Sequence, residues 1–167
     1  MSRVEEIKQQ IEELEKKTQE LQKELEIEKQ KEVKCPFKYG DEYFLLPSDG
    51  MVSESIWGDY KFDNRALSQG NIFKTKEEAE LEHDKRDLLT RFRQFRDQCN
   101  GDWKPDLKIV GLPKYCIAIN NKTDIMFAMD VTFYNEFNPF GYFKKKEDCQ
   151  RAIQLFEDEI KRLFVEE

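Results

Sequence analysis

The sequence predicts an α+β protein in which an N-terminal coiled-coil helix precedes two related units of β-hairpin, strand and helix, whose strands form antiparallel sheet. Three observations support this prediction. Apolar residues recur at spacings of three and four near the N-terminus, the period changes to two after Asp41, and one phrase of aromatic, lysine and acidic residues occurs twice. We therefore expect a dimerisation helix at residues 1–34, a first module at 39–101 and a second module at 112–167.

The N-terminal segment contains no glycine or proline and has a heptad pattern. Branched residues predominate at the a positions and leucine at the d positions, which favours two parallel strands. The apolar residues of this seam are Val4, Ile7, Ile11, Leu14, Leu21 and Leu25. Thr18 at an a position either sets the register or is tolerated, and Cys35-Pro36 should end the helix. We expect a homodimer through this helix; packing on its own domain and binding to another protein are the alternatives.

The first module should begin with a hairpin of strands at residues 43–46 and 51–57, joined by a turn at Asp49-Gly50. Residues 58–70 are expected to form an irregular polar loop that leads into a short strand at 72–73.

A capping-box pattern at Thr75 and Glu78 predicts the start of the first long helix of this module, which should end near Asn100-Gly101. The residues expected on its buried stripe are Leu81, Leu88, Phe92, Phe95 and Cys99.

The second module repeats this order, with strands expected at about 114–119, 124–134 and 140–144 before a closing helix. Phe73 aligns with Phe143. Lys145 stands where the first module has Thr75, so the closing helix should lack a side-chain cap. Its expected apolar face consists of Cys149, Ile153, Phe156, Ile160, Leu163 and Phe164.

Composition limits the functions to consider. The net charge of −7 opposes the neutralisation of phosphates, so direct DNA binding is not expected. No stretch approaches the roughly 20 apolar residues of a membrane span, and the N-terminus lacks a signal-peptide core, so we expect a cytoplasmic protein without membrane association. The four cysteines form no CxxC pair, and three of them lie in segments expected to pack as helix or strand. We interpret the cysteines as small buried residues in a reducing compartment.

Catalytic groups are sparse in this sequence. His83 is the only histidine and lies in a highly charged predicted helix, and neither GxGxxG nor a phosphate-binding GKS or GKT occurs. We therefore expect no catalytic residues, no cofactor and no metal site.

Two sets of residues are candidates for binding. Aromatic and acidic residues follow the first hairpin, and aromatic residues dominate interface hot spots. The predicted partner-binding residues are Trp57, Asp59, Tyr60 and Asp63. Basic and aromatic residues alternate in the predicted helix beyond His83, a pattern that can indicate contact with nucleic acid. This alternative patch consists of Arg86, Arg93 and Arg96.

The segment from Trp57 to Glu80, which includes WGDY and FKTKEEAE, resembles small accessory proteins encoded by phages and prophages of Gram-positive bacteria. The resemblance extends over about residues 39–165, including the strand near Lys114-Tyr115. It implies a viral, acidic and non-catalytic protein in the cytoplasm of a bacterial host cell, a class that includes anti-CRISPR proteins. We therefore expect an inhibitor that binds and blocks a host defence nuclease such as a CRISPR effector. The alternatives are a nucleic-acid-binding accessory protein and a sponge for a small signalling nucleotide.

Overall fold

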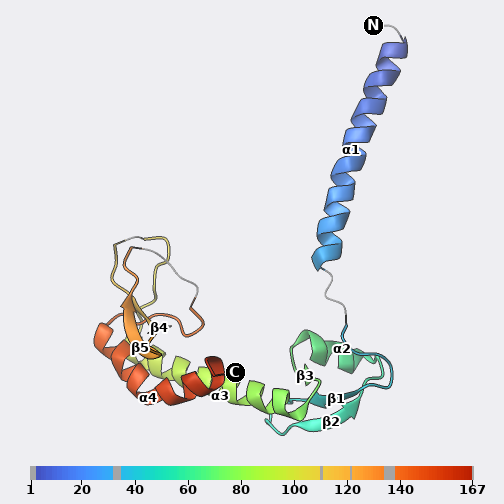
Figure 1. Ribbon diagram of the computed structural model, residues 1–167. Helices are drawn as coiled ribbons and strands as arrows, with labels where there is room; N and C mark the ends of the chain where they lie inside the picture. Colours follow the sequence, from blue (N-terminus) through green and yellow to red (C-terminus); the bar gives the residue numbers. More distant parts are fainter. Residues whose placement is uncertain (1–2, 32–34, 110, 121, 134–137, 167) are drawn as a thin grey trace. The chain divides into compact units, whose positions relative to one another are not determined.

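The computed structural model describes residues 3–31, 35–109, 111–120, 122–133 and 138–166 (Figure 1). The chain divides into two compact units, Met1–Asp41 and Glu42–Glu167, which are described separately. The mixed α+β class that the sequence predicts is confirmed.

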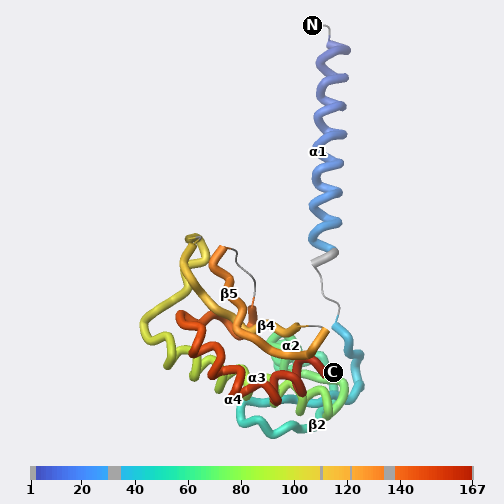
Figure 2. Tube along the Cα trace, turned by 60° about the vertical axis from the view of Figure 1, so that its left-hand side comes forward, coloured from blue at the N-terminus to red at the C-terminus, as the bar shows by residue number. Residues whose placement is uncertain are grey.

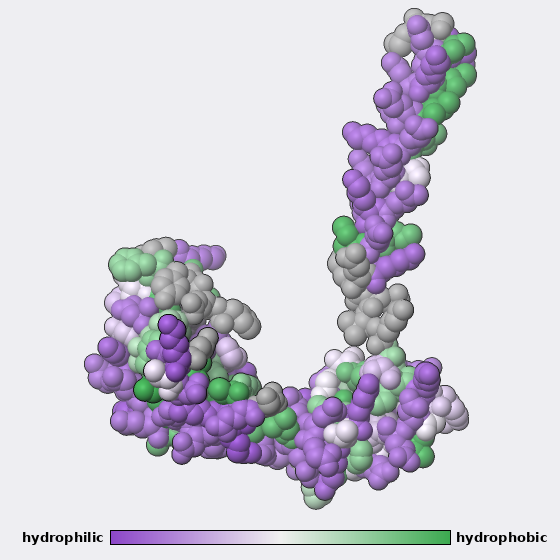
Figure 3. All heavy atoms as spheres, in the orientation of Figure 1, coloured by the Kyte–Doolittle hydropathy of each residue, from purple (hydrophilic) through white to green (hydrophobic). Residues whose placement is uncertain are grey.

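The first unit contains one long helix, α1 (Arg3–Lys31). The predicted seam residues are 43–64% exposed and form an apolar stripe along a polar rod (Figure 3). Thr18 donates its hydroxyl to the carbonyl of Leu14 at 2.8 Å, so this polar group is satisfied within the helix. The N-terminal helix is therefore confirmed, whereas its pairing with a second copy stays a prediction.

The second unit contains three helices and five strands among its described residues. They are β1 (Glu42–Leu45), β2 (Ser53–Ile56), α2 (Lys61–Ser68), β3 (Ile72–Phe73), α3 (Lys76–Asn100), β4 (Tyr115–Asn120), β5 (Ile125–Asp130) and α4 (Lys146–Phe164). Their first sheet is antiparallel with the order β2-β1-β3, and β4 pairs with β5 in a second, antiparallel sheet. The first sheet and α2 lie by the N-terminal part of α3, and the hairpin of β4 and β5 lies beside α4 (Figures 1 and 2).

One expectation for the first sheet region is wrong. Residues 61–68 form α2 where the sequence predicted an irregular loop. This helix has only eight residues, and only Asp63 and Ala66 among them are buried. Two turns are too short for an apolar period to be recognised in the sequence.

The expected strand at 140–144 is reduced to a single bridge, in which Tyr115 and Phe143 exchange main-chain hydrogen bonds of 2.9 and 2.7 Å. The side chain of Asn100 binds the edge of this segment that faces away from β4. Its amide donates to the carbonyl of Tyr142 at 2.8 Å and its oxygen accepts from the amide of Lys144 at 3.0 Å. These two groups are thereby bonded to a side chain at the end of α3.

The aligned phenylalanines occupy similar positions in the two sheets. Phe73 pairs with Phe44 of β1, and Phe143 bridges Tyr115 of β4, so each lies beside the first strand of a hairpin. However, α2 precedes Phe73, whereas the described residues before Phe143 contain no such helix. The origin of the two halves from one repeated unit stays a prediction.

The main core lies between α3, α4 and the second hairpin. Phe92 is fully buried, and the centroid of its ring lies 4.9 Å from that of Phe140, 5.8 Å from Phe143 and 5.3 Å from Phe156. Such aromatic pairs add about 0.5–1.5 kcal/mol each beyond the burial of their area. Phe164, at the end of the predicted α4 face, is at the surface but its ring meets that of Phe140 at 5.6 Å.

Both helix starts are as predicted. Thr75 accepts from the amide of Glu78 at 3.2 Å, and the carboxylate of Glu78 accepts in return from the amide of Thr75 at 3.3 Å. Lys145 precedes α4 without a side-chain hydrogen bond to the helix.

Candidate protein-binding surface

The turn between β2 and α2 is built around the carboxylate of Asp63, which is only 3% exposed. One oxygen accepts from the hydroxyl of Tyr43 at 3.0 Å. The other accepts from the amides of Gly58 at 2.9 Å and Tyr60 at 3.1 Å. Asp63 therefore ties the turn and the first turn of α2 to β1.

The same contacts determine the pKa of this carboxyl. Burial alone would raise the pKa of Asp63, but the hydrogen bonds from the amides of Gly58 and Tyr60 and from the hydroxyl of Tyr43 hold it below its ordinary value. The charge is thus stabilised inside the protein by fixed donors.

Two of the predicted contact residues lie beneath the surface, which corrects the sequence interpretation. Trp57 is 3% exposed, and its ring meets the ring of Tyr43 edge-on at 6.3 Å. Asp63 is buried with it for the reason given above. In this conformation neither side chain is available as a first contact for a partner, and both instead support the turn.

The outer side of the same turn is exposed. Tyr60 is 66% exposed and Phe62 is 59% exposed, and Asp59 lies directly before them. The backbone of Asp59 has a φ of 56°, a left-handed conformation that aspartate adopts more readily than most residues. Asn64 donates to Oδ1 of Asp59 at 2.9 Å and so orients this carboxylate. We call Asp59, Tyr60 and Phe62 the binding edge.

Phe62 was not singled out by the sequence. It was one of many aromatic residues near the hairpins, and their exposure could not be ranked without the position of α2. The position of Phe62 in the first turn of α2 would have indicated its exposure, but the sequence analysis did not predict α2.

The alternative patch of arginines is not a free basic surface. Arg86 donates to Glu82 at 2.7 Å, to the side-chain oxygen of Asn71 at 2.7 Å and to the carbonyl of Gly70 at 2.7 Å. These bonds fasten the segment after α2 to α3. The guanidinium of Arg86 therefore acts within the protein.

Arg96 is similarly engaged. It donates to the carbonyl of Phe140 at 3.0 Å and to the carboxylate of Asp97 at 2.7 and 2.9 Å. Arg93 is exposed, and it forms no ion pair with any residue that the structure describes. Only one of the three predicted arginines is thus left for an external phosphate.

Another hollow of the described surface contains the exposed His83. It is a shallow depression between the first hairpin and α3, and Ser48, Asp49 and Asp87 are among its other lining residues. Over the described ranges, no group of three histidine, cysteine or acidic residues is arranged to hold a metal ion. Burial raises the pKa of the Cys149 thiol to about 12, with a smaller contribution from Cys116.

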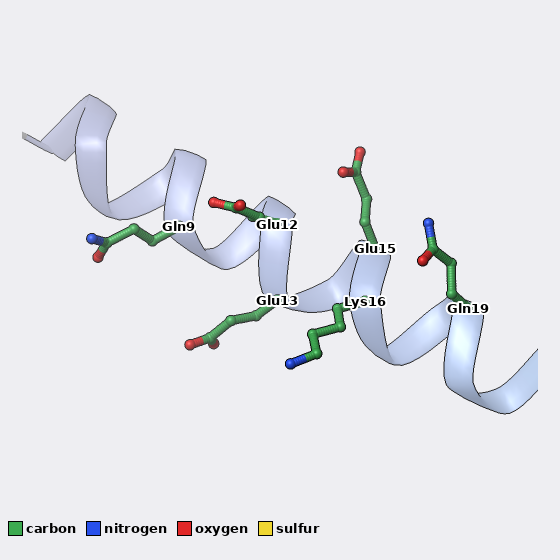
Figure 4. Close-up of a pocket in the computed structure, with 6 residues that line it drawn as sticks. All are labelled: Gln9, Glu12, Glu13, Glu15, Lys16 and Gln19. Carbon is green, nitrogen blue, oxygen red and sulfur yellow. The ribbon is translucent and has the colours of Figure 1, made fainter.

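A further hollow lies on α1, and Figure 4 shows its lining side chains extending from that helix. They are Gln9, Glu12, Glu13, Glu15, Lys16 and Gln19. All six come from one helix, so this is an open stretch of polar helix surface.

Comparison with known proteins gives no relative. No protein-family model, curated protein or solved structure matches the chain. Within the described residues, no helix is long and apolar enough to cross a membrane. The resemblance to phage accessory proteins therefore stays a prediction.

Proposed function

We propose that this chain is a non-enzymatic inhibitor of viral origin that binds a host defence nuclease, such as a CRISPR effector, through the binding edge. One observation carries the proposal. Two exposed aromatic side chains and an oriented carboxylate project from a turn whose backbone is held by the buried Asp63. The viral origin and the class of target rest on the sequence resemblance of residues 57–80.

The physical argument for binding is preorganisation. A turn that is already ordered in the free protein loses little conformational entropy on binding. Tyr60 supplies a large contact area with a polar tip, which is typical of interface hot spots. Asp59 and the net charge of −7 are complementary to the basic channel with which a nuclease holds nucleic acid.

The test is a titration of guide-loaded CRISPR effector nucleases, purified as a panel, with the full chain. A nuclease that is bound should lose cleavage activity stoichiometrically, saturating at about one binding unit per target. Asp59→Lys should slow association, and Tyr60→Ala should raise the dissociation rate about tenfold or more. The matched control is Glu54→Lys, which makes the same charge change at an exposed residue of β2.

Inhibition that Asp59→Lys and Tyr60→Ala leave unchanged would contradict the assignment of the binding edge. Multiple-turnover inactivation, or a cleaved or covalently altered target, would contradict the non-enzymatic function. If no member of the panel is bound, the proposed class of target is wrong.

The proposal includes assembly into a parallel homodimer through α1. In parallel register the seam residues and Thr18 form seven successive layers from Val4 to Leu25. Glu24 at a g position then faces Lys29 at an e position of the other copy, which is an attractive pair. Burying the exposed apolar stripe supplies the driving force.

Light scattering and sedimentation of the full chain test the dimer. Leu14→Asn should give a monomer at tens of micromolar, whereas Lys16→Asn on the opposite face of α1 should not. Cys35 is exposed and follows α1 by four residues, so oxidation with diamide should join the two chains of a parallel dimer through it. In an antiparallel dimer these cysteines would lie at opposite ends of a rod of about 43 Å and would not cross-link. An intact chain that stays monomeric would rule out this part of the proposal.

A further inference from the structure

The main-chain groups on the outer edge of β5 have no main-chain partner among the described residues. Tyr115 directs its amide and carbonyl to Phe143, away from β5. Since this direction alternates along an antiparallel strand, the register of β4 and β5 turns the amides and carbonyls of Met126 and Ala128 to the outer edge of β5. Among the described residues, no strand pairs with that edge.

The outer edges of β2 and β4 differ from that of β5. In β2, three of the four residues are polar and Glu54 is exposed, with Ile56 as the one exposed apolar residue. The outer edge of β4 is covered by the bridge to Phe143 and by Asn138, which donates to the carbonyl of Ile117 at 3.0 Å.

By contrast, β5 has the sequence Ile-Met-Phe-Ala-Met-Asp, with Ile125 60% and Phe127 44% exposed. An exposed apolar edge without lysine, proline or bulge invites pairing, so proteins normally avoid one that has no partner.

A groove runs between this edge and α4. Met126 and Ala128 of β5 lie on one side, and the α4 side contributes Lys146, Gln150, Ile153 and Gln154. The apolar side chains of Met126 and Ile153 are buried, whereas both glutamines are exposed and can hydrogen-bond. The groove therefore offers an apolar floor, a polar rim and a row of main-chain donors and acceptors.

The N-terminal end of α4 adds positive charge to one end of the groove. Lys144, Lys145 and Lys146 are consecutive and exposed, and no side chain caps the helix there. Lys146 lies close enough to Asp130 at the end of β5 to help lower the pKa of that carboxyl, after the larger effect of its hydrogen bonds from Thr132. Lys146 lines the groove, whereas Glu147 and Asp148 of the first turn of α4 are not among its lining residues, so this end favours an acidic group on a bound molecule.

We propose that the groove binds an extended peptide segment of a partner protein, which adds a strand to β5. The peptide exchanges main-chain hydrogen bonds with Met126 and Ala128, places an apolar side chain over Ile153 and places an acidic side chain near Lys146. Strand addition of this kind takes its affinity from the main chain and its specificity from the flanking side chains.

The experiment starts from the full chain and a phage-displayed library of random 12-residue peptides. The tightest selected peptide, labelled with a fluorophore, serves as the probe. Gln150→Trp should fill the groove and weaken its binding at least about tenfold, whereas Leu155→Trp at an exposed α4 position outside the groove should not. Lys146→Glu should weaken binding about threefold, and less at high salt.

Hydrogen exchange gives the decisive readout. Bound peptide should slow exchange of the amides of Met126 and Ala128, while the amide of Phe127 is already paired with β4 and should change little. A peptide that binds equally well to Gln150→Trp, or that leaves both edge amides unprotected, would overturn the proposal. So would a selection that yields no binder better than about 1 mM. If Gln150→Trp instead changes the oligomeric state, the outer edge of β5 pairs with a second copy of the chain.

Discussion

The hydroxyl of Tyr43 donates a hydrogen bond to the carboxylate of Asp63 at 3.0 Å, and neither side chain is more than 3% exposed. Tyr43 lies in β1 and Asp63 in the first turn of α2. The bond therefore joins the first sheet to the segment that carries the binding edge. The buried Asp63 thus determines the positions of the exposed residues Asp59 and Tyr60.

Removal of this carboxylate should destabilise the second unit. Asp63→Ala leaves the amides of Gly58 and Tyr60 and the hydroxyl of Tyr43 without their acceptor, at a cost of about 2–3 kcal/mol. Urea unfolding followed by circular dichroism measures the change. Asp59→Asn, which keeps an exposed residue that tolerates a positive φ, should stay within about 0.5 kcal/mol. Equal effects of the two substitutions would contradict the role assigned to Asp63.

Protonation of the Asp63 carboxyl should contribute to a fall in the free energy of unfolding in acid. The pKa of Asp63 is lowered in the folded protein, since its hydrogen bonds outweigh the effect of burial. Its contribution is therefore fully present above the ordinary aspartate pKa of about 4 and is lost as the pH falls through the lower, folded value. Urea midpoints between pH 6 and pH 3 should drop more steeply for the natural chain than for Asp63→Asn. Parallel pH profiles would contradict this prediction.

The ion pair between Arg91 of α3 and Glu159 of α4 should couple the two helices modestly. Its nitrogen–oxygen distances are 3.1 and 2.5 Å, and the guanidinium lowers the pKa of the Glu159 carboxyl. Because both side chains are about 40% exposed, we expect a coupling energy of only about 0.5–1 kcal/mol. A double-mutant cycle with Arg91→Gln and Glu159→Gln measures it.

The pair of Arg162 and Asp84 is the control for this cycle. It joins the same two helices at 3.3 Å and is more exposed. Its coupling should be smaller and should vanish in high salt. If the control pair couples as strongly as Arg91 and Glu159, the bidentate geometry of the Arg91–Glu159 pair is unimportant for the coupling energy.

The four thiols should react in a fixed order. Cys35 is exposed, contrary to the burial expected from the sequence, and should be alkylated first. The pKa of Cys99 is raised by partial burial and by Asp148, and burial raises that of Cys149 to about 12, so thiolate is scarce at both. Pulsed maleimide labelling read by mass spectrometry should modify Cys116 and Cys149 only when the protein unfolds. Their modification in the folded protein at the rate of Cys35 would contradict the core described here.

The sequence by itself determined the features that depend on neighbours in the chain. The period of the apolar residues located α1, α3 and the buried face of α4, because three or four residues bring side chains to one side of a helix. The capping pair of Thr75 and Glu78 located the start of α3, since both of its hydrogen bonds close within four residues. The short β3 followed from the turn residues before it.

The tertiary structure alone decided which polar and aromatic residues face solvent. The acceptor for Tyr43 lies 20 residues away at Asp63, and Arg96 finds its carbonyl partner at Phe140, 44 residues away. The composition of a segment carries no information about hydrogen-bond partners so distant in the chain. Asp63 and Arg96 were therefore expected at the surface. The free edge of β5 likewise appeared only with the pairing of the strands, because an apolar strand has the same sequence whether a neighbour covers it or not.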